Sequence, residues 1–323
     1  MFRDSAYPRF CRLIAITMLV AGLTAVQALA PAGARRPASV PADYVITPFG
    51  YFHPSCVHQL ARGEAVRKDA KAIQHADGSL ESLQACTHPQ FNAKGDLTAQ
   101  NGEPVKTPAN QPAIGHAWIE YSSVKSSTSF GELIAEWTVP PNPTVNSGQT
   151  VYLFPGMEDY ADVVSIIQPV LGWNSDYASA WGIASWNCCV AGHAFEATPQ
   201  KVKSGDTIYG AMWDTCAAGT LSCPTWDILT EDLSTGVWSE MVNTSSYGQT
   251  FNWAFAGALE VYNISVCGNY PPSNATSFHN LYLYNDAFSL IPSPTWSVSN
   301  ISGGLTPQCS YGGYMQQQVT LTY

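Results

Sequence analysis

A glutamine lies in the middle of an apolar segment, residues 165–172, whose side chains are predicted to alternate between the two faces of a β-strand. Gln168 would share its face with Val164, Ile166 and Val170. A buried carboxamide without a hydrogen-bond partner costs about 1–3 kcal/mol. The amide is therefore either satisfied by neighbouring backbone or solvent, or it is a hydrogen-bond donor that serves a reaction.

A glutamate occupies a comparable place in a second apolar segment, residues 255–264. Alternation predicts that Glu260 shares a face with Ala256, Ala258 and Tyr262, and small neighbours leave space above a carboxylate. A carboxyl group in such a space can move a proton to or from a substrate. For any single acid of this chain, a solvated position on a sheet face is the simpler interpretation.

Several standard catalytic motifs are absent from the sequence. It has no Gly-x-Ser-x-Gly elbow, no phosphate-binding Walker loop, no dinucleotide glycine fingerprint and no His-Glu-x-x-His pair. Five residues near the N-terminus are of the types that bind zinc: His53, Cys56, His58, Cys86 and His88. In an exported chain the two cysteines among them are expected to form a disulfide with each other instead. The sequence therefore predicts neither a cofactor nor a metal.

Basic residues are scarce in most of the chain. Charged residues make up 12% of the composition, the net charge is -10, and beyond residue 120 the only basic side chains are Lys125, Lys201 and Lys203. Binding to nucleic acid or to an anionic membrane needs several Lys or Arg contacts, so both are excluded. Few cations also mean little self-repulsion once carboxylates are neutralised, which suits a protein that works in acid.

The first 30 residues resemble a secretory signal. Three arginines precede an apolar run at 14–29, and Ala-Leu-Ala at 28–30 is a small-x-small cleavage site. A signal anchor is the alternative, but the run is short for a membrane span. We therefore predict a secreted protein that has no membrane segment after cleavage.

Eight cysteines remain after the signal, and an even number in an exported chain indicates four disulfides. Their nearness along the chain predicts the pairs Cys56–Cys86 and Cys216–Cys223. The adjacent Cys188 and Cys189 are then expected to reach the last two cysteines, Cys267 and Cys309, in an order that stays open.

The remaining chain divides into a small N-terminal region, residues 31–115, and a β domain, residues 116–323. The first is expected to be a pro-segment or a cap, and the second an all-β, antiparallel two-sheet β-sandwich of the jelly-roll, concanavalin-like type. Short strands separated by turn residues support this, at 130–139, 150–155, 163–172, 179–187, 206–213, 225–232, 237–243, 254–264, 279–285 and 314–323. Ten tryptophans are many for this length, and some of them are expected to line a groove and bind an extended polymer through stacking contacts.

Six segments in sequence order resemble the glutamic peptidases called eqolisins, across about residues 117–285. They are AEWTVP (135–140), IIQ (166–168), YASAWGIASW (177–186), SGDTI (204–208), LSTG (233–236) and ALEV (258–261). The resemblance implies a secreted, acid-active endopeptidase that acts on polypeptides and is made with a pro-segment. It further implies that Glu260 acts as general base and then acid, while the Gln168 amide holds the attacking water and stabilises the oxyanion. Substrate contacts are predicted from Trp137, Trp173, Trp181, Trp186 and Glu136.

The chain also departs from the eqolisin pattern. Residues 259–262 lack the tryptophan and the second acid that follow the family's catalytic glutamate. If the chain is closer in style to neprosin-type peptidases, which use two glutamates, then Glu158 or Glu136 becomes the alternative partner. Two other functions fit a monomeric sandwich: a glycoside hydrolase with paired carboxylates, and a lectin-like module with no catalysis.

Overall fold

The computed structural model describes residues 36–101, 103–104, 117–161, 165–300, 309, 312–315 and 319–323. The predicted signal at 1–30 and the predicted domain boundary between residues 115 and 116 lie outside these ranges. Within them the chain is almost entirely β-strand, and its only helices are short 3-10 turns. No helix in these ranges is both long and apolar enough to cross a membrane.

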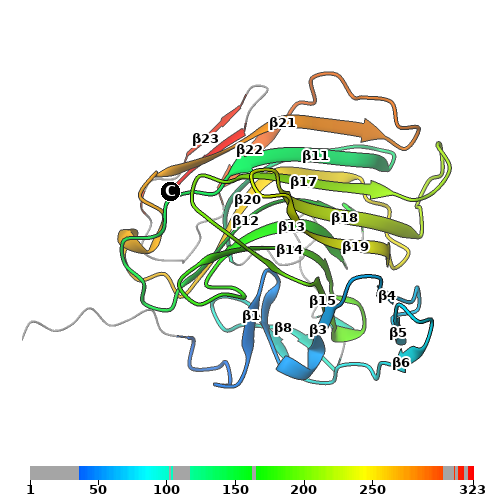
Figure 1. Ribbon diagram of the computed structural model, residues 1–323, viewed down its shortest axis with the longest axis horizontal. Helices are drawn as coiled ribbons and strands as arrows, with labels where there is room; N and C mark the ends of the chain where they lie inside the picture. Colours follow the sequence, from blue (N-terminus) through cyan, green and yellow to red (C-terminus); the bar gives the residue numbers. More distant parts are fainter. Residues whose placement is uncertain are drawn as a thin grey trace, which may run out of the picture. The chain divides into compact units, whose positions relative to one another are not determined.

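Two large sheets form the predicted sandwich (Figure 1). The seven-stranded sheet has the order β19-β18-β17-β11-β21-β24-β23. Its strands are β11 (Phe130–Thr138), β17 (Thr207–Asp214), β18 (Thr225–Asp232), β19 (Val237–Ser245), β21 (Ala275–Asn285), β23 (Gly312–Met315) and β24 (Val319–Thr322). All its pairings are antiparallel, as the sequence predicts.

The nine-stranded sheet has the order β22-β10-β20-β12-β13-β14-β15-β3, with β16 also paired to β14. Its strands are β3 (Val57–Leu60), β10 (Trp118–Lys125), β12 (Thr150–Glu158), β13 (Ile166–Trp173), β14 (Trp181–Cys188), β15 (Ala194–Ala197), β16 (Gln200–Val202), β20 (Trp253–Tyr262) and β22 (Ser297–Asn300). Strand β3 is the exception to the antiparallel pattern, because it runs parallel to β15. The short strands β15, β16 and β22, and also β10, are not among the predicted ones.

The inward faces of the two sheets form the main core. On β11 the alternation is as predicted, with Leu133, Ala135 and Trp137 fully buried between the sheets. The two sheets also approach each other closely at a residue that has no side chain. A Cβ on Gly257 of β20 would lie 2.4 Å from the ring of Phe278, which comes from β21 of the opposite sheet.

The described residues before the sandwich, 36–101 and 103–104, form the N-terminal cap. Five of its strands pair in one sheet: β1 (Val45–Thr47), β2 (Gly50–Phe52), β7 (Gln90–Phe91), β8 (Leu97–Gln100) and β9 (Glu103–Pro104). Three more pair in another: β4 (Ala65–Val66), β5 (Ala72–Gln74) and β6 (Leu80–Ser82). The cap supplies β3 to the nine-stranded sheet, so the two regions share a sheet edge.

A second apolar cluster forms where the cap meets the outer face of the nine-stranded sheet. Phe49, Tyr51 and Phe52 of the cap are fully buried there, with Phe154 and Tyr262 of the sheet among their cluster partners. Both faces of the central strands are therefore covered. All eight residues of β13 and all ten of β20 are buried.

Two predicted disulfides, Cys56–Cys86 and Cys216–Cys223, are confirmed. The prediction for the other four cysteines is wrong. Cys188 bonds to its neighbour Cys189, and Cys267 bonds to Cys309. The tertiary fold brings the Cα atoms of Cys267 and Cys309 within 5.6 Å of each other. That distance is typical of disulfides.

We expect Gly257→Ala to destabilise the protein by about 1–3 kcal/mol, because its methyl group would overpack the Phe278 ring. Urea unfolding measures the loss. In a Phe278→Leu background the same change should be much less harmful, since the clashing ring is absent. Equal losses in the two backgrounds would mean that the two sheets do not approach each other closely at this point.

Candidate active site

Gln168 lies at the centre of β13 and is fully buried. Its neighbours Ile166 and Val170 belong to the cluster under the cap, so the amide belongs to the outer face of the nine-stranded sheet. Within the described ranges, neither its Nε2 nor its Oε1 has a hydrogen-bond partner. The facing residue is Gly156, where a Cβ would lie 3.3 Å from Cγ of Gln168. A buried amide without protein partners is suited to bind a ligand or a water.

Glu260 lies on β20, in register with Trp118 of β10 and Tyr152 of β12. Its carboxyl group accepts a 3.1 Å hydrogen bond at Oε2 from the Trp118 indole, and a hydrogen bond at Oε1 from the Tyr262 hydroxyl. Burial raises the pKa of Glu260 well above its usual value, although these two hydrogen bonds act in the opposite direction. The buried position of Glu260 therefore favours the neutral form of its carboxyl group.

Gln168 and Glu260 lie on the same face but not opposite each other. Strand pairing places Glu260 level with Tyr152 and with Gly172, which is four residues from Gln168 on β13. At about 3.3 Å per residue the offset along the strands is about 13 Å. Phe154, two residues after Tyr152 on the intervening strand, lies on the same face between them. The fold brings the two predicted residues to one surface and separates them with an aromatic ring.

Glu158 is nearer to Gln168 by register. It lies on β12, the strand adjacent to β13, and pairs with Ile166, two residues from Gln168. Diagonal neighbours of this kind have Cα atoms about 7–8 Å apart. Glu158 is fully buried. Of the acids predicted as partners of the amide, it is the one that the strand register favours.

A further acid lies in the same row of the sheet. Trp186 of β14 pairs with Gln168 on one side and with Glu196 of β15 on the other. Burial, and then the nearby carboxylate of Asp176, raise the pKa of Glu196 well above its usual value. The Gln59 amide donates a 3.4 Å hydrogen bond to its Oε2. The sequence does not single out Glu196, because the adjacent strands that align it with Gln168 are far apart in the chain.

The N-terminal cap covers this face. Phe49 packs edge-on against Trp186 with ring centroids 5.7 Å apart, and Tyr51 packs in the same manner against Tyr262 at 5.4 Å. The Tyr51 hydroxyl also donates a 2.8 Å hydrogen bond to Oδ1 of Asn263. The space expected above Glu260 is thus filled by the cap.

Ala256 differs from its predicted position. A register shift between β12 and β20 places Ala256 in the core between the sheets, while Ala258 and Tyr262 share the outer face with Glu260. An irregularity of this kind inserts a residue and reverses the alternation on one side of it. Sequence alternation alone therefore assigned one neighbour to the wrong face.

The predicted substrate-binding tryptophans are divided between the two faces. Trp137, Trp173 and Trp181 are buried in the core between the sheets, which corrects the expectation that they line a groove. Their alternation points them inward, where large rings fill the space between sheets. Trp186 alone of the four lies on the outer face with Gln168.

Glu136 lies apart from the other candidates, on the outward face of the seven-stranded sheet. It accepts a 2.9 Å hydrogen bond from the Asn280 amide, and Nε2 of His279 is 3.8 Å from its carboxylate. The fold therefore does not place Glu136 with Gln168, because their strands belong to different sheets.

Two eqolisin-type structures are similar to this chain. One is a crystal structure of scytalido-glutamic peptidase with a peptide-based transition state analog, at 15% identity over 64% of this chain and 98% of that chain, with a TM-score of 0.47. The other is SCP-B, a member of the eqolisin family of peptidases in complex with the tripeptide Ala-Ile-His, at 17% identity over 64% and 98%, with a TM-score of 0.45. No protein-family model and no curated protein matches the chain. Distant likeness of folds does not assign a chemical role to any residue.

The raised pKa of Glu260 predicts a pH-dependent stability difference. Between the unfolded value of about 4.3 and the raised folded value, the native state binds more protons than the unfolded state. Its favourable contribution is thus complete below about pH 4.3 and is lost as pH rises through the folded pKa. Relative to Glu260→Gln, which does not titrate, the wild type should lose on the order of 1.4 kcal/mol per unit of pKa difference.

Urea unfolding of both proteins at about pH 3.5 and about pH 7.5 measures this difference. The exposed acid Glu240, on β19 of the other sheet, provides a matched control in Glu240→Gln. A wild-type-minus-variant difference that is the same at both pH values would show that Glu260 has an ordinary pKa.

Proposed function

We propose that this protein is a secreted hydrolase that cleaves peptide bonds in acid, with the Gln168 amide at the centre of its active site. The observation that carries the proposal is the fully buried amide that has no hydrogen-bond partner in the described ranges. It lies on a sheet face that also bears the carboxyl groups of Glu158 and Glu260. An amide and a carboxyl group on one face are the groups that a water-mediated acyl transfer needs.

In this proposal the Gln168 amide donates a hydrogen bond to the oxyanion that develops on the scissile carbonyl. An amide keeps its protons at every pH, so it remains a donor in acid. The carboxyl group takes a proton from the attacking water and then gives one to the leaving amine. The strand register favours Glu158 for this role, and Glu260, which is offset from Gln168 by about 13 Å along the strands, is the acid that the eqolisin resemblance implies.

The N-terminal cap acts as a pro-segment in this proposal. It covers the candidate face, so a polypeptide can reach Gln168 only after the cap moves. Cap movement would also hydrate Glu260, whose pKa is raised chiefly by burial. Hydration lowers the pKa of a carboxyl group toward its ordinary value of about 4.3, where it can act as a base in acid. Access and activation would therefore occur together.

Glycan hydrolysis is the second candidate. Glu196 and Asp176 lie close enough for the Asp176 charge to raise the pKa of Glu196, and a pair of acids is what glycoside hydrolysis requires. The peptide proposal ranks first because paired carboxyl groups leave the unpartnered Gln168 amide without a role.

The test is hydrolysis of an acid-denatured protein substrate by the full chain at about pH 2 to 7. We expect cleavage confined to acid. Gln168→Ala should lower kcat by about 100- to 1000-fold, the usual effect of removing one oxyanion donor. Loss of the acid that transfers the proton, in Glu158→Gln or in Glu260→Gln, should lower it by about 100- to 10,000-fold.

Two matched variants complete the experiment. Glu158→Gln distinguishes the two possible acids, since only loss of the proton-transferring group should abolish cleavage. Glu240→Gln removes an exposed carboxyl group of the other sheet and should leave activity unchanged. If cleavage survives in Glu260→Gln but not in Glu158→Gln, Glu158 is the acid. No cleavage of peptides at any pH would refute the peptidase proposal and direct the assay to glycans.

A further inference from the structure

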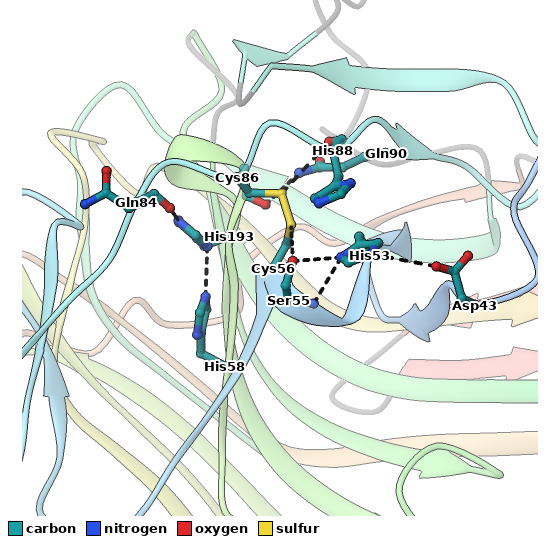
Figure 2. Close-up of a disulfide and its surroundings, with 11 residues drawn as sticks. Asp43, His53, Ser55, Cys56, His58, Gln84, Cys86, His88, Gln90 and His193 are labelled. Atoms are coloured by element: carbon teal, nitrogen blue, oxygen red, sulfur yellow. Dashed lines mark hydrogen bonds and ion pairs between the residues drawn. A yellow bond between two sulfur atoms is a disulfide. The ribbon is translucent and has the colours of Figure 1, made fainter.

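Four histidines lie around the Cys56–Cys86 disulfide, where the N-terminal cap meets the sandwich (Figure 2). His53 and His88, both in the cap, stack with ring centroids 3.6 Å apart. His58 lies on β3 of the cap, whereas His193 follows the short turn η2 (Val190–Gly192) in the sandwich. The His58–His193 pair therefore joins the two regions directly.

His193 is held by two parts of the cap at once. Its Nδ1 lies 2.9 Å from Nε2 of His58, and its Nε2 lies 2.9 Å from the carbonyl oxygen of Gln84. A carbonyl can only accept, so Nε2 of His193 carries a proton. In the neutral ring Nδ1 is then the acceptor, and His58 donates to it from Nε2. Both rings are neutral in this arrangement.

Further hydrogen bonds surround the pair. The backbone N–H of Cys86 donates to the carbonyl of Ala191 at 2.9 Å, and the Gln90 amide donates to the carbonyl of Gly192 at 2.8 Å. Strand β3 pairs in parallel with β15, which starts one residue after His193. The disulfide links Cys56, the residue before β3, to Cys86, so separation at the histidine pair affects both attachments.

We propose that the His58–His193 pair is an acid-sensitive latch that holds the N-terminal cap on the outer face of the nine-stranded sheet and releases it when both rings are protonated. The latch regulates access to the face that bears Gln168, and in that respect it rests on the proposed function.

Counting protons shows why two are needed. One added proton can be shared, because His193 can donate from Nδ1 if the proton of His58 moves to its other nitrogen. A second proton places two cations with their facing nitrogens 2.9 Å apart and leaves no acceptor between them. The rings must then separate.

The surrounding charges do not compensate for this repulsion. In the described ranges His193, once protonated, is the charged group that acts on His58, and the Gln84 carbonyl is the polar group that acts on His193. The acid on the adjacent strand, Glu196, is engaged with Gln59 and Asp176. Asp43 is 3.7 Å from His53, so its carboxylate interacts with the stacked His53–His88 pair and not with the His58–His193 pair.

The direction of the pH effect follows from the pKa values. Burial, and then the charge that His193 carries when protonated, lower the pKa of His58 from 6.5 to about 4, and burial also lowers that of His193. The open state therefore binds more protons than the closed state. Closure is complete above about pH 6.5 and weakens as pH falls toward about 4. For His58 alone the shift changes the open-to-closed ratio by roughly 300-fold.

Amide hydrogen exchange of the full chain at about pH 7, 5 and 3.5 tests the latch, with rates corrected for intrinsic exchange at each pH. We expect residues 57–60 and 84–90 to lose protection in acid while β11 and β17 stay protected. His58→Gln keeps a donor for His193 but takes up no proton, so it should reduce the acid-dependent change at least about tenfold. His58→Lys carries one permanent charge and can still donate to neutral His193, so its cap should stay closed at neutral pH and open on uptake of one proton instead of two.

His279→Gln, on the seven-stranded sheet, is the matched control and should behave as wild type. Equal protection of the two cap segments at pH 7 and 3.5 in the wild type would overturn the latch, as would an unchanged transition in His58→Gln. The readout needs no enzymatic activity. Cap opening without peptide cleavage would support the latch and refute the peptidase, whereas cleavage from a cap that stays protected would do the reverse.

Discussion

The structure depends on burial of both faces of the nine-stranded sheet. Antiparallel sheets commonly have one face against a core and one in water. Here the seven-stranded sheet covers one face of the central strands and the N-terminal cap covers the other, so that every residue of β13 and β20 is buried. Polar side chains on the second face, Gln168 and Glu260 above all, therefore lie in an apolar environment although they belong to the outer face of the sandwich.

This coverage determines the electrostatics of the candidate site. A carboxyl group in contact with water would titrate near its ordinary value, whereas burial raises the pKa of Glu260 despite the hydrogen bonds that Trp118 and Tyr262 donate to it. The same coverage leaves the Gln168 amide with no partner in the described ranges. Exposure of this face and the position of the cap are consequently linked, because any movement that uncovers the face also admits water to these groups.

The histidine pair places a second titrating element at the edge of the same cap. The His193 ring makes both of its described hydrogen bonds with the cap: it accepts one from His58 and donates one to the carbonyl of Gln84. Both rings are neutral in the closed state and resist protonation because they are buried. Acid thus acts on the contact between the regions and on the carboxyl groups beneath it, in a molecule with few basic residues to repel one another.

Sequence alone determined the fold class and most strands of the sandwich, because alternation with period two is local and survives folding. Leu133, Ala135 and Trp137 point inward as that alternation requires. What depends on contacts between distant segments was decided by the tertiary structure. The register shift near Ala256, the Cys188–Cys189 bond, the Phe154 ring between Glu260 and Gln168, and the cap over the outer face have no local signal. They arise only when strands far apart in the chain are paired, and pairing determines which side chains meet.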